Sequence, residues 1–217
     1  MVYTIGGIKG GSGKTTLATN LAVMLHLKGR DVLFVDADDQ ETATDFTHWR
    51  NENLPEGSGY TAIQLANNAV RTEVLKLKNK YDDIVIDTGG RDTTSQRAAM
   101  TVSDVYVVPF IPRSFDMWTL EKVARLIDEM RAAKPDLRAY AVLNKTDARG
   151  SDNVEAKEFL GETDSITLVE ASIGHRKSFA NAASKGLSVV EFKPSDDKAI
   201  AEMNLLFDIL TKEWLMI

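Results

Sequence analysis

Apolar residues gather in short runs along the chain, and stretches of helical length separate these runs. Several runs are rich in Val and Ile with little polar alternation, which is typical of strands covered on both faces of a sheet. The alternation predicts an α/β fold with a mostly parallel, doubly wound sheet and helices on both faces. The predicted strands are Val2–Ile8, Asp31–Val35, Tyr60–Gln64, Asp83–Ile86, Val105–Phe110, Ala139–Leu143 and Thr167–Glu170.

The stretches between the strands carry helix patterns with recognisable ends. Thr93 and Gln96 have the spacing of a capping box, and Pro135 predicts that a long helix stops after Lys134. The 217 residues fit one domain spanning 1–217. The predicted helices are Lys14–Lys28, Thr42–Asn51, Asn67–Lys80, Thr93–Val102, Phe115–Lys134, Asn153–Gly161, His175–Ala183 and Ser195–Trp214.

Composition and charge narrow the class of protein. A 43% apolar content is enough for a full core, and the absence of cysteine excludes disulfides and cysteine-ligated metals. The formal charge of −6 argues against uniform coating by nucleic acid, although a local basic patch stays possible. No run reaches the roughly 18 apolar residues that a membrane span needs. Because the chain enters a strand at once, we expect no signal peptide, and a reducing cytosol is compatible with the composition.

The first predicted strand is followed by the sequence Lys-Gly-Gly-Ser-Gly-Lys-Thr-Thr, residues 9–16. Glycines let the backbone curl so that successive N–H groups point inward, and the following helix adds its free amides and positive dipole end. The lysine can reach the β- and γ-phosphates, and the first threonine hydroxyl can ligate Mg²⁺. Ile8 replaces the first glycine of the usual G-x-x-x-x-G-K-[ST] pattern. The segment predicts a nucleoside triphosphate site formed by Gly10, Gly11, Ser12, Gly13, Lys14, Thr15 and Thr16.

Two further strands end in carboxylates. The second strand runs into Asp36-Ala37-Asp38-Asp39-Gln40, and aspartates in such a place can hold Mg²⁺ waters or orient an attacking water. An acidic turn that only caps a helix is the alternative. Ile84-Val85-Ile86-Asp87 has the Walker B pattern, which predicts that Asp87 binds Mg²⁺ through water. Thr88-Gly89-Gly90 then suits a switch that senses the γ-phosphate.

Asn144-Lys145-Thr146-Asp147 follows a predicted strand and matches the [NT]KxD guanine motif of GTPases. In that motif an aspartate accepts two hydrogen bonds from the guanine edge. The match keeps GTP open as the nucleotide. A simple strand-end turn at Asn144 is the alternative.

Lys9 adds a second lysine at the start of the phosphate loop. With it the loop resembles KGGxGK[ST], the motif of the deviant Walker A family, the ParA/MinD ATPases. The resemblance implies that Lys9 crosses a dimer interface to the partner's nucleotide, although a solvated Lys9 is the alternative. It places Asp36 near the metal and Asp38 beside the hydrolytic water, with Asp39 in place of the usual proline. It also puts Asn144 in a base-contacting loop and favours ATP over GTP.

The segment from Ile173-Gly174-His175-Arg176 to Gly186-Leu187-Ser188-Val189-Val190-Glu191 resembles the C-terminal region of partition ATPases. In that family basic residues of this region contact DNA without sequence preference. A solvated face is the alternative for these cations. The candidates are Arg176, Lys177, Lys185, Lys193 and Lys198. The last helix has an apolar stripe, but its other face mixes Glu202, Asp208, Lys212 and Glu213, so we expect core packing and no membrane targeting.

Taken over nearly the whole chain, the resemblance implies a ParA-like ATPase of the small plasmid type. ATP and Mg²⁺ would join two subunits into a homodimer, the dimer would bind non-specific DNA, and a centromere-binding adaptor protein would stimulate hydrolysis. The protein would then be cytoplasmic and nucleoid-associated, moving a plasmid or chromosome. Three alternatives stay open: an ATPase that positions a protein cargo, a GTP-binding regulator, and a ligase of the dethiobiotin synthetase kind.

Overall fold

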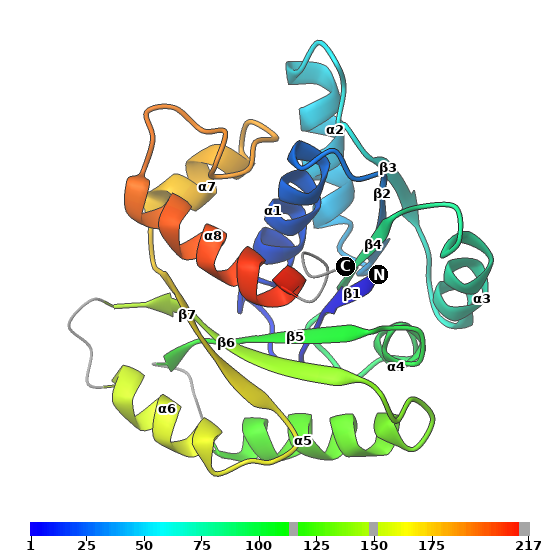
Figure 1. Cartoon of the computed structure of the whole chain (residues 1–217), viewed down its shortest axis with the longest axis vertical. Helices are drawn as coiled ribbons and strands as arrows, with labels where there is room; N and C mark the ends of the chain where they lie inside the picture. Colours follow the sequence, from blue (N-terminus) through cyan, green and yellow to red (C-terminus); the bar gives the residue numbers. More distant parts are fainter. Residues whose placement is uncertain (113–116, 148–151, 213–217) are drawn as a thin grey trace.

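Seven parallel strands form one sheet at the centre of the computed structural model, which describes residues 1–112, 117–147 and 152–212 (Figure 1). The strands follow the order β3-β2-β4-β1-β5-β6-β7, so β1 lies in the middle and the chain winds outward from it in both directions. This confirms the predicted doubly wound sheet. The strands are β1 (Val2–Ile5), β2 (Val32–Ala37), β3 (Thr61–Gln64), β4 (Asp83–Thr88), β5 (Val105–Phe110), β6 (Arg138–Thr146) and β7 (Thr167–Gly174).

Helices cover both faces of the sheet, as expected for strands that are apolar throughout. One face carries α1 (Lys14–Leu27), α2 (Thr42–Asn53), α7 (Lys177–Ala183) and α8 (Asp197–Thr211), which share one core cluster. The other face carries α3 (Asn68–Leu77) and α4 (Thr94–Met100) beside β2 and β4, and α5 (Met117–Arg131) and α6 (Asp152–Gly161) beside β5 and β6. Figure 1 shows α1, α7 and α8 above the sheet, α5 and α6 below it, and α3 and α4 at its right.

The apolar stripe of α8 packs into the core. Met203, Phe207 and Leu210 are buried among residues of α1 and the sheet, and Ile200 is half-buried. The expected core packing is therefore confirmed, while Trp214 lies outside the described residues. Among the helices of residues 1–112, 117–147 and 152–212, none combines the length and apolar character that crossing a bilayer would require.

The central strand β1 is shorter than predicted, and the difference shapes the site. It ends at Ile5, so the predicted end at Ile8 is wrong. Gly6 lies so close to the ring of Tyr106 that a side chain would not fit, and Gly7 has a φ of 136° that favours glycine. The chain therefore leaves the sheet at this point and starts the phosphate loop three residues earlier than the apolar pattern indicates.

Strands β6 and β7, at one edge of the sheet, are longer than predicted. β6 continues through Asn144 to Thr146, and β7 continues to Gly174. Their pairing is irregular between Asn144 and Thr146, and Lys145 has a φ of 55°. The last residues of β6 are polar, because they lie beside the phosphate loop. A prediction based on apolar runs therefore ended the strand too early.

Several predicted helices extend one to three residues beyond an observed helix end, in part because the prediction counts capping residues as helix. Asp196 stands before α8 and accepts a hydrogen bond from the Ala199 backbone N at 3.1 Å. Thr93 caps α4 as predicted, accepting from Gln96 N at 3.2 Å. In a full capping box the Gln96 side chain would accept from the Thr93 backbone N. Here it accepts instead from Gly7 N at 3.1 Å.

Candidate nucleotide-binding site

The loop between β1 and α1 borders a cavity of about 640 Å³ at the carboxyl end of the sheet. Gly11 and Gly13 have φ values of 71° and 94°, which glycine adopts without steric cost. Gly13 directly precedes α1, whose free amides and dipole favour an anion at this end. The volume is that of a typical ligand site. The predicted loop residues that line it are Gly10, Gly11, Gly13, Lys14, Thr15 and Thr16.

Lys14 is the buried cation of the loop, with 6% of its surface exposed. Its Nζ donates to the Lys9 carbonyl oxygen at 3.0 Å, and Ser12 Oγ donates to the same oxygen at 3.3 Å. Burial lowers the pKa of the Lys14 ammonium, while the carboxylates of Asp87 and Asp38 oppose that change. A phosphate oxygen is a stronger acceptor than a neutral carbonyl, so Lys14 can exchange this contact for a bound triphosphate.

Asp87 ends β4 with a carboxyl group that is fully buried. Neither of its oxygens has a hydrogen-bond partner among the described residues. Burial raises the pKa of Asp87 to about 8, and the nearby Asp36 carboxylate raises it further. The Thr15 hydroxyl is the main group that lowers the pKa. A buried carboxyl without partners is costly to keep, and a hydrated divalent cation would supply the missing contacts. Asp87 and Thr15 therefore fit the predicted Mg²⁺ site.

Asp36 stands beside Asp87 in the pairing of β2 with β4, so the two predicted metal residues are brought together. The Asp36 carboxylate is already occupied. It accepts from Thr44 N at 2.9 Å, from Thr44 Oγ1 at 2.7 Å and from Asp38 N at 3.2 Å. Asp36 thus fixes the start of α2 and the turn before it. No group of three His, Asp or Glu side chains suited to a metal occurs in the described part of the chain, as expected where Mg²⁺ keeps waters and phosphate ligands.

Asp38 lines the cavity with its half-buried side chain. Its carboxylate accepts from Gln40 N at 3.2 Å and lies against Gly89, where an added Cβ would come within 3.1 Å of Oδ1. Asp39 lines the same cavity and is exposed. Asp38 is therefore positioned between the turn after β2 and the glycines after β4, where it borders the cavity.

Asn144 lies behind the phosphate loop and not among the cavity-lining residues. Its Nδ2 donates to the Ser12 carbonyl at 2.7 Å, and its Oδ1 accepts from Lys145 N at 2.9 Å. Lys145 Nζ donates to the Gly11 carbonyl at 2.7 Å. The end of β6 thus holds the back of the loop. The base contact of Asn144 stays a prediction, and the observed contact is a supporting one.

Lys9 is half-buried beside a narrow apolar hollow lined by Ile8, Val108 and Phe110. It does not line the main cavity, although its carbonyl holds Lys14. Its side chain is thus placed beside the nucleotide site of its own subunit and not within it.

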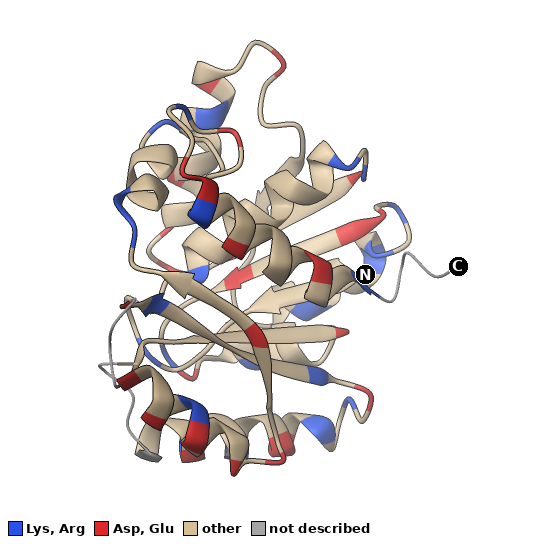
Figure 2. Cartoon of the chain, turned by 60° about the vertical axis from the view of Figure 1, so that its left-hand side comes forward, with Lys and Arg blue, Asp and Glu red and all other residues tan. Residues whose placement is uncertain are grey.

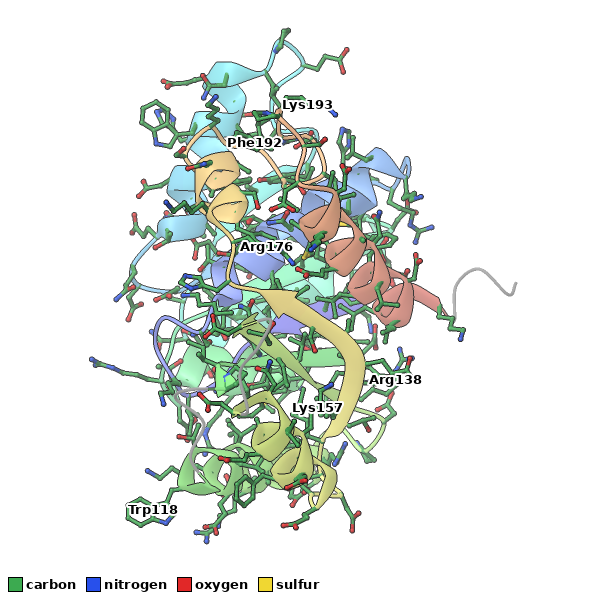
Figure 3. The ribbon with its side chains drawn as sticks, turned by 90° about the vertical axis from the view of Figure 1, so that its left-hand side faces the viewer. Trp118, Arg138, Lys157, Arg176, Phe192 and Lys193 are labelled. Carbon is green, nitrogen blue, oxygen red and sulfur yellow. The ribbon has the colours of Figure 1, made fainter. Side chains whose placement is uncertain are left out.

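The predicted DNA-contacting cations are spread over the C-terminal region. Arg176, at the start of α7, forms a two-fold ion pair with Glu202 of α8 at 3.1 and 2.5 Å. Lys185 lies over the Phe192 ring at 5.4 Å from its centroid. Lys177, Lys185, Lys193 and Lys198 are exposed. Figure 2 shows basic and acidic residues interspersed around α7 and α8, and Figure 3 shows Arg176 well separated from Lys193. The structure does not gather these five residues into one cluster.

Sequence reasoning missed several residues at the site. Lys145 holds the loop, and its place in the Asn-Lys-x-Asp motif was the available signal. Gln96 binds Gly7 and Thr88 from inside α4, and no sequence pattern marks such a contact. Arg91, Thr93 and Ser95 line the cavity without having been predicted there, whereas Gly89 and Gly90, which also line it, belong to the predicted switch.

Comparison with known proteins agrees with this geometry. The profile of the CobQ/CobB/MinD/ParA nucleotide-binding domain family matches residues 3–189. The maintenance of carboxysome distribution protein A of Gloeobacter kilaueensis is 32% identical, covering 95% of this chain and 92% of its own. Its namesake from Halothiobacillus neapolitanus is 28% identical, covering 94% of this chain and 93% of its own. Protein IncC of Escherichia coli is 26% identical, covering 94% of this chain and 67% of its own.

Solved structures share the fold at lower identity. The apo McdA of Cyanothece superposes with a TM-score of 0.76 at 16% identity, covering 96% of this chain and 98% of that one. A plasmid partition protein from Borrelia burgdorferi gives a TM-score of 0.71 at 20% identity, covering 98% of both chains. The chain therefore belongs to the CobQ/CobB/MinD/ParA nucleotide-binding family, with the P-loop fold of the ParA and MinD proteins.

Proposed function

We propose that this protein is a Mg²⁺-dependent ATPase that works as a nucleotide switch to position a cellular cargo. The observation that carries the proposal is a cavity lined by Lys14 and Thr15, together with the fully buried carboxyl of Asp87 near Thr15, which has no hydrogen-bond partner among the described residues. These are the groups that a triphosphate and its cation would need. The lysine would exchange its carbonyl contact for phosphate, and the carboxyl would gain ligands that it lacks.

The residues divide the work of hydrolysis. Glycine amides and Lys14 hold the phosphates, and Thr15 and Asp87 hold Mg²⁺, which would neutralise charge on the phosphates. Asp38 faces the cavity beside Gly89 and orients the attacking water, which it can do as an acceptor. Asp36 positions Asp38 by accepting from its backbone N. Asp38 is therefore a catalytic residue in this proposal and Asp36 a positioning residue.

In this proposal Lys9 contacts the nucleotide of a second subunit and so links dimerisation to ATP binding. Its side chain is half-buried outside the cavity of its own subunit, which suits a contact with the nucleotide of a second copy. ATP would then join two subunits, and hydrolysis would separate them. Another member of the fold class, the MinD protein of Aquifex aeolicus, has been solved in complex with MinC. We infer by analogy that a protein partner reads the dimeric state of this chain.

The cargo we favour is a large protein assembly. Two of the relatives that match this chain over more than nine-tenths of both lengths are named for carboxysome distribution. IncC, in contrast, is matched over two-thirds of its length. DNA partition is the second candidate, supported by the likeness to a plasmid partition fold. In both cases the ATP-bound dimer would hold on to DNA of any sequence through exposed lysines such as Lys177 and Lys193.

The first test is ATP turnover by the wild type and by Asp38→Ala. We expect Mg²⁺-dependent hydrolysis by the wild type, and a loss of about tenfold or more in the variant, because its water is poorly oriented. ATP binding should persist in the variant. Asp39→Ala is the matched control and should hydrolyse ATP normally. Equal turnover by wild type and Asp38→Ala would move the water-positioning role elsewhere.

The second test is ATP-dependent dimerisation measured by sedimentation. Lys9→Ala should bind ATP as a monomer, whereas Asp38→Ala should accumulate as a dimer with ATP and Mg²⁺. A normal dimer of Lys9→Ala would remove the role of this lysine in the partner's site.

The third test separates the alternatives. GTP bound in preference to ATP would favour a GTP-binding regulator, and turnover that needs a small carboxylated substrate would favour a ligase. To distinguish the cargoes, turnover should be measured with DNA and with the protein encoded next to this one. Stimulation that requires a centromere-like DNA sequence would support partition, and stimulation by a component of a protein assembly would support positioning.

A further inference from the structure

Gln96 is a fully buried polar side chain in the first turn of α4. Its Oε1 accepts from Gly7 N, at the start of the phosphate loop, at 3.1 Å. Thr88 Oγ1, at the end of β4, lies 3.3 Å from the same oxygen and shares its one proton between that oxygen and the Ile5 carbonyl at 3.2 Å. One amide thus joins three segments that border the nucleotide cavity. Its Nε2 is buried without a hydrogen-bond partner among the described residues, so the contacts of this side chain all pass through its oxygen.

The turn between β4 and α4 also contacts the phosphate loop at its other end. A Cβ added at Gly90 would come within 2.7 Å of Gly10 Cα and 2.8 Å of Gly10 N, so the two backbones are in direct contact. Gly89, Gly90, Arg91 and Thr93 of this turn line the cavity, as does Ser95 at the start of α4. The turn is therefore fixed against the phosphate loop at two points, backbone contact at Gly90 and the side-chain amide at Gln96.

We propose that Gln96 is a positioning residue for ATP hydrolysis, setting the distance between the phosphate loop and the turn after β4. This rests on the proposed ATPase function. Asp38 packs against Gly89 of that turn, so a shift of the turn would also move the group that orients the water. The groups proposed to hold the phosphates, the glycine amides and Lys14, lie on the loop and at the start of α1. Removal of the Gln96 hydrogen bonds should therefore slow the chemical step more than it weakens ATP binding.

The interaction depends on an acceptor and not on volume. Gly7 N donates to Oε1, Thr88 Oγ1 shares its proton with the same oxygen, and a thioether of similar size cannot replace that oxygen for two donors. Gln96→Met removes the acceptor and keeps the bulk, whereas Gln96→Glu keeps an acceptor oxygen in place. Ser103→Ala is the matched control. Ser103 is fully buried at the far end of α4, where its Oγ binds the Ala99 carbonyl at 2.7 Å and contacts Thr4 Oγ1.

The experiment measures three quantities for the wild type and these variants: ATP affinity, kcat with Mg²⁺, and hydrogen exchange at the Gly7 amide. For Gln96→Met we expect kcat to fall by about tenfold or more, with ATP affinity within about threefold. Its Gly7 amide should exchange faster, because its acceptor is gone. Gln96→Glu should recover part of kcat and of the Gly7 protection. Ser103→Ala should leave both unchanged even if it lowers the melting temperature.

The inference is overturned if Gln96→Met hydrolyses ATP like the wild type, or if its ATP affinity falls by the same factor as its kcat. If Gln96→Met does not fold, Thr88→Val and Gln96→Glu test the same interaction, because the first removes one donor and the second keeps the acceptor. Failure of the proposed function has a different signature. In that case the wild type itself would not hydrolyse ATP, while the exchange at Gly7 would still respond to Gln96→Met.

Discussion

The phosphate site and the segment Gly186–Glu191, here named the C-terminal strap, use charged and polar groups in opposite ways. At the phosphate site Lys14 donates to a neutral carbonyl, and Asp87 has no partner among the described residues. At the strap each such group is paired. Arg50 of α2, 2% exposed, binds Glu191 through two nitrogens at 2.7 and 2.8 Å. The polar groups of one region are kept for a ligand, and those of the other hold the fold together.

Two helices that start at the nucleotide cavity hold the strap. Arg50 also donates to the carbonyls of Ser58 at 2.8 Å and Gly186 at 3.0 Å. Asn20 of α1 accepts from Ser188 Oγ at 2.7 Å and Val189 N at 2.9 Å. A buried polar group with all its partners in place specifies one arrangement of the chain. A buried group that lacks them, such as Asp87, points to a ligand.

The largest expected effect is at the strap. Arg50→Met should lower the free energy of unfolding by about 3–5 kcal/mol, because it leaves Glu191 and two carbonyls without their donor. Urea denaturation measures this. The control is Lys76→Met, which breaks the exposed Lys76–Glu73 pair on α3 and should cost less than about 0.5 kcal/mol. A cost as small as the control's would mean that the strap is not held by this pair.

The second largest effect should be on ATP binding at the phosphate site, with the free energy of unfolding nearly unchanged. Lys14→Ala should weaken ATP binding by about 100-fold, because it removes the buried cation of the loop. Titration of a fluorescent ATP analogue measures this, with urea denaturation in parallel. If stability fell as far as in Arg50→Met, Lys14 would be a structural group and the contrast between the two regions would fail.

A third effect concerns Asp87 and depends on pH. Its pKa of about 8 in the folded protein lies above the ordinary value of 3.8, so the folded state keeps a proton that the unfolded chain has lost. Without Mg²⁺, this carboxyl should lower stability progressively as the pH rises from about 4 to about 8. Asp87→Asn should therefore melt at a higher temperature than the wild type at pH 8, because the amide has no charge to bury. The two proteins should melt together near pH 4.

The same variant tests the metal. Asp87→Asn should reduce the dependence of ATP binding on Mg²⁺, since an amide is a weaker ligand than a carboxylate. An unchanged Mg²⁺ dependence would contradict the Walker B assignment even if the pH effect were present.

The smallest effect concerns DNA. Lys177→Glu should weaken DNA binding by the ATP-bound dimer several-fold, and the salt dependence of binding should become shallower by about one unit of slope for each DNA phosphate that is no longer neutralised. Arg176→Glu should instead destabilise the protein, because Arg176 is paired with Glu202. Mobility shifts at two salt concentrations and a melting curve separate the outcomes. Weaker DNA binding by Arg176→Glu without any loss of stability would return this arginine to the DNA surface.

The fold and the phosphate loop could be predicted because their signals are local. Strands β2, β4 and β5 are uninterrupted apolar runs, and glycines at 11 and 13 have the positive φ values that the loop requires. The end of β1 could not be predicted in this way. It depends on the ring of Tyr106 lying against Gly6, a contact between residues 100 positions apart.

The roles of individual polar residues depended even more on distant contacts. Arg176 matched a family pattern for DNA contact, but its position beside α8 gives it Glu202 as a partner. Asn144 matched two nucleotide-base patterns, but the extension of β6 places its amide on the Ser12 carbonyl. A motif predicts which side chains are present, and the fold decides which of them already have partners.

The strap also sets the order in which the chain can be completed during synthesis. Ser188 lies 168 residues from Asn20, and Glu191 lies 141 residues from Arg50, so these contacts can form only after residues 188 and 191, respectively, have left the ribosome. By then α1, α2 and the central strands have already emerged. The helices that begin at the nucleotide cavity therefore gain their last fixed contacts from a late part of the chain. Contacts of such long separation are slow to form, so final rigidity of the site is expected to trail behind collapse of the sheet.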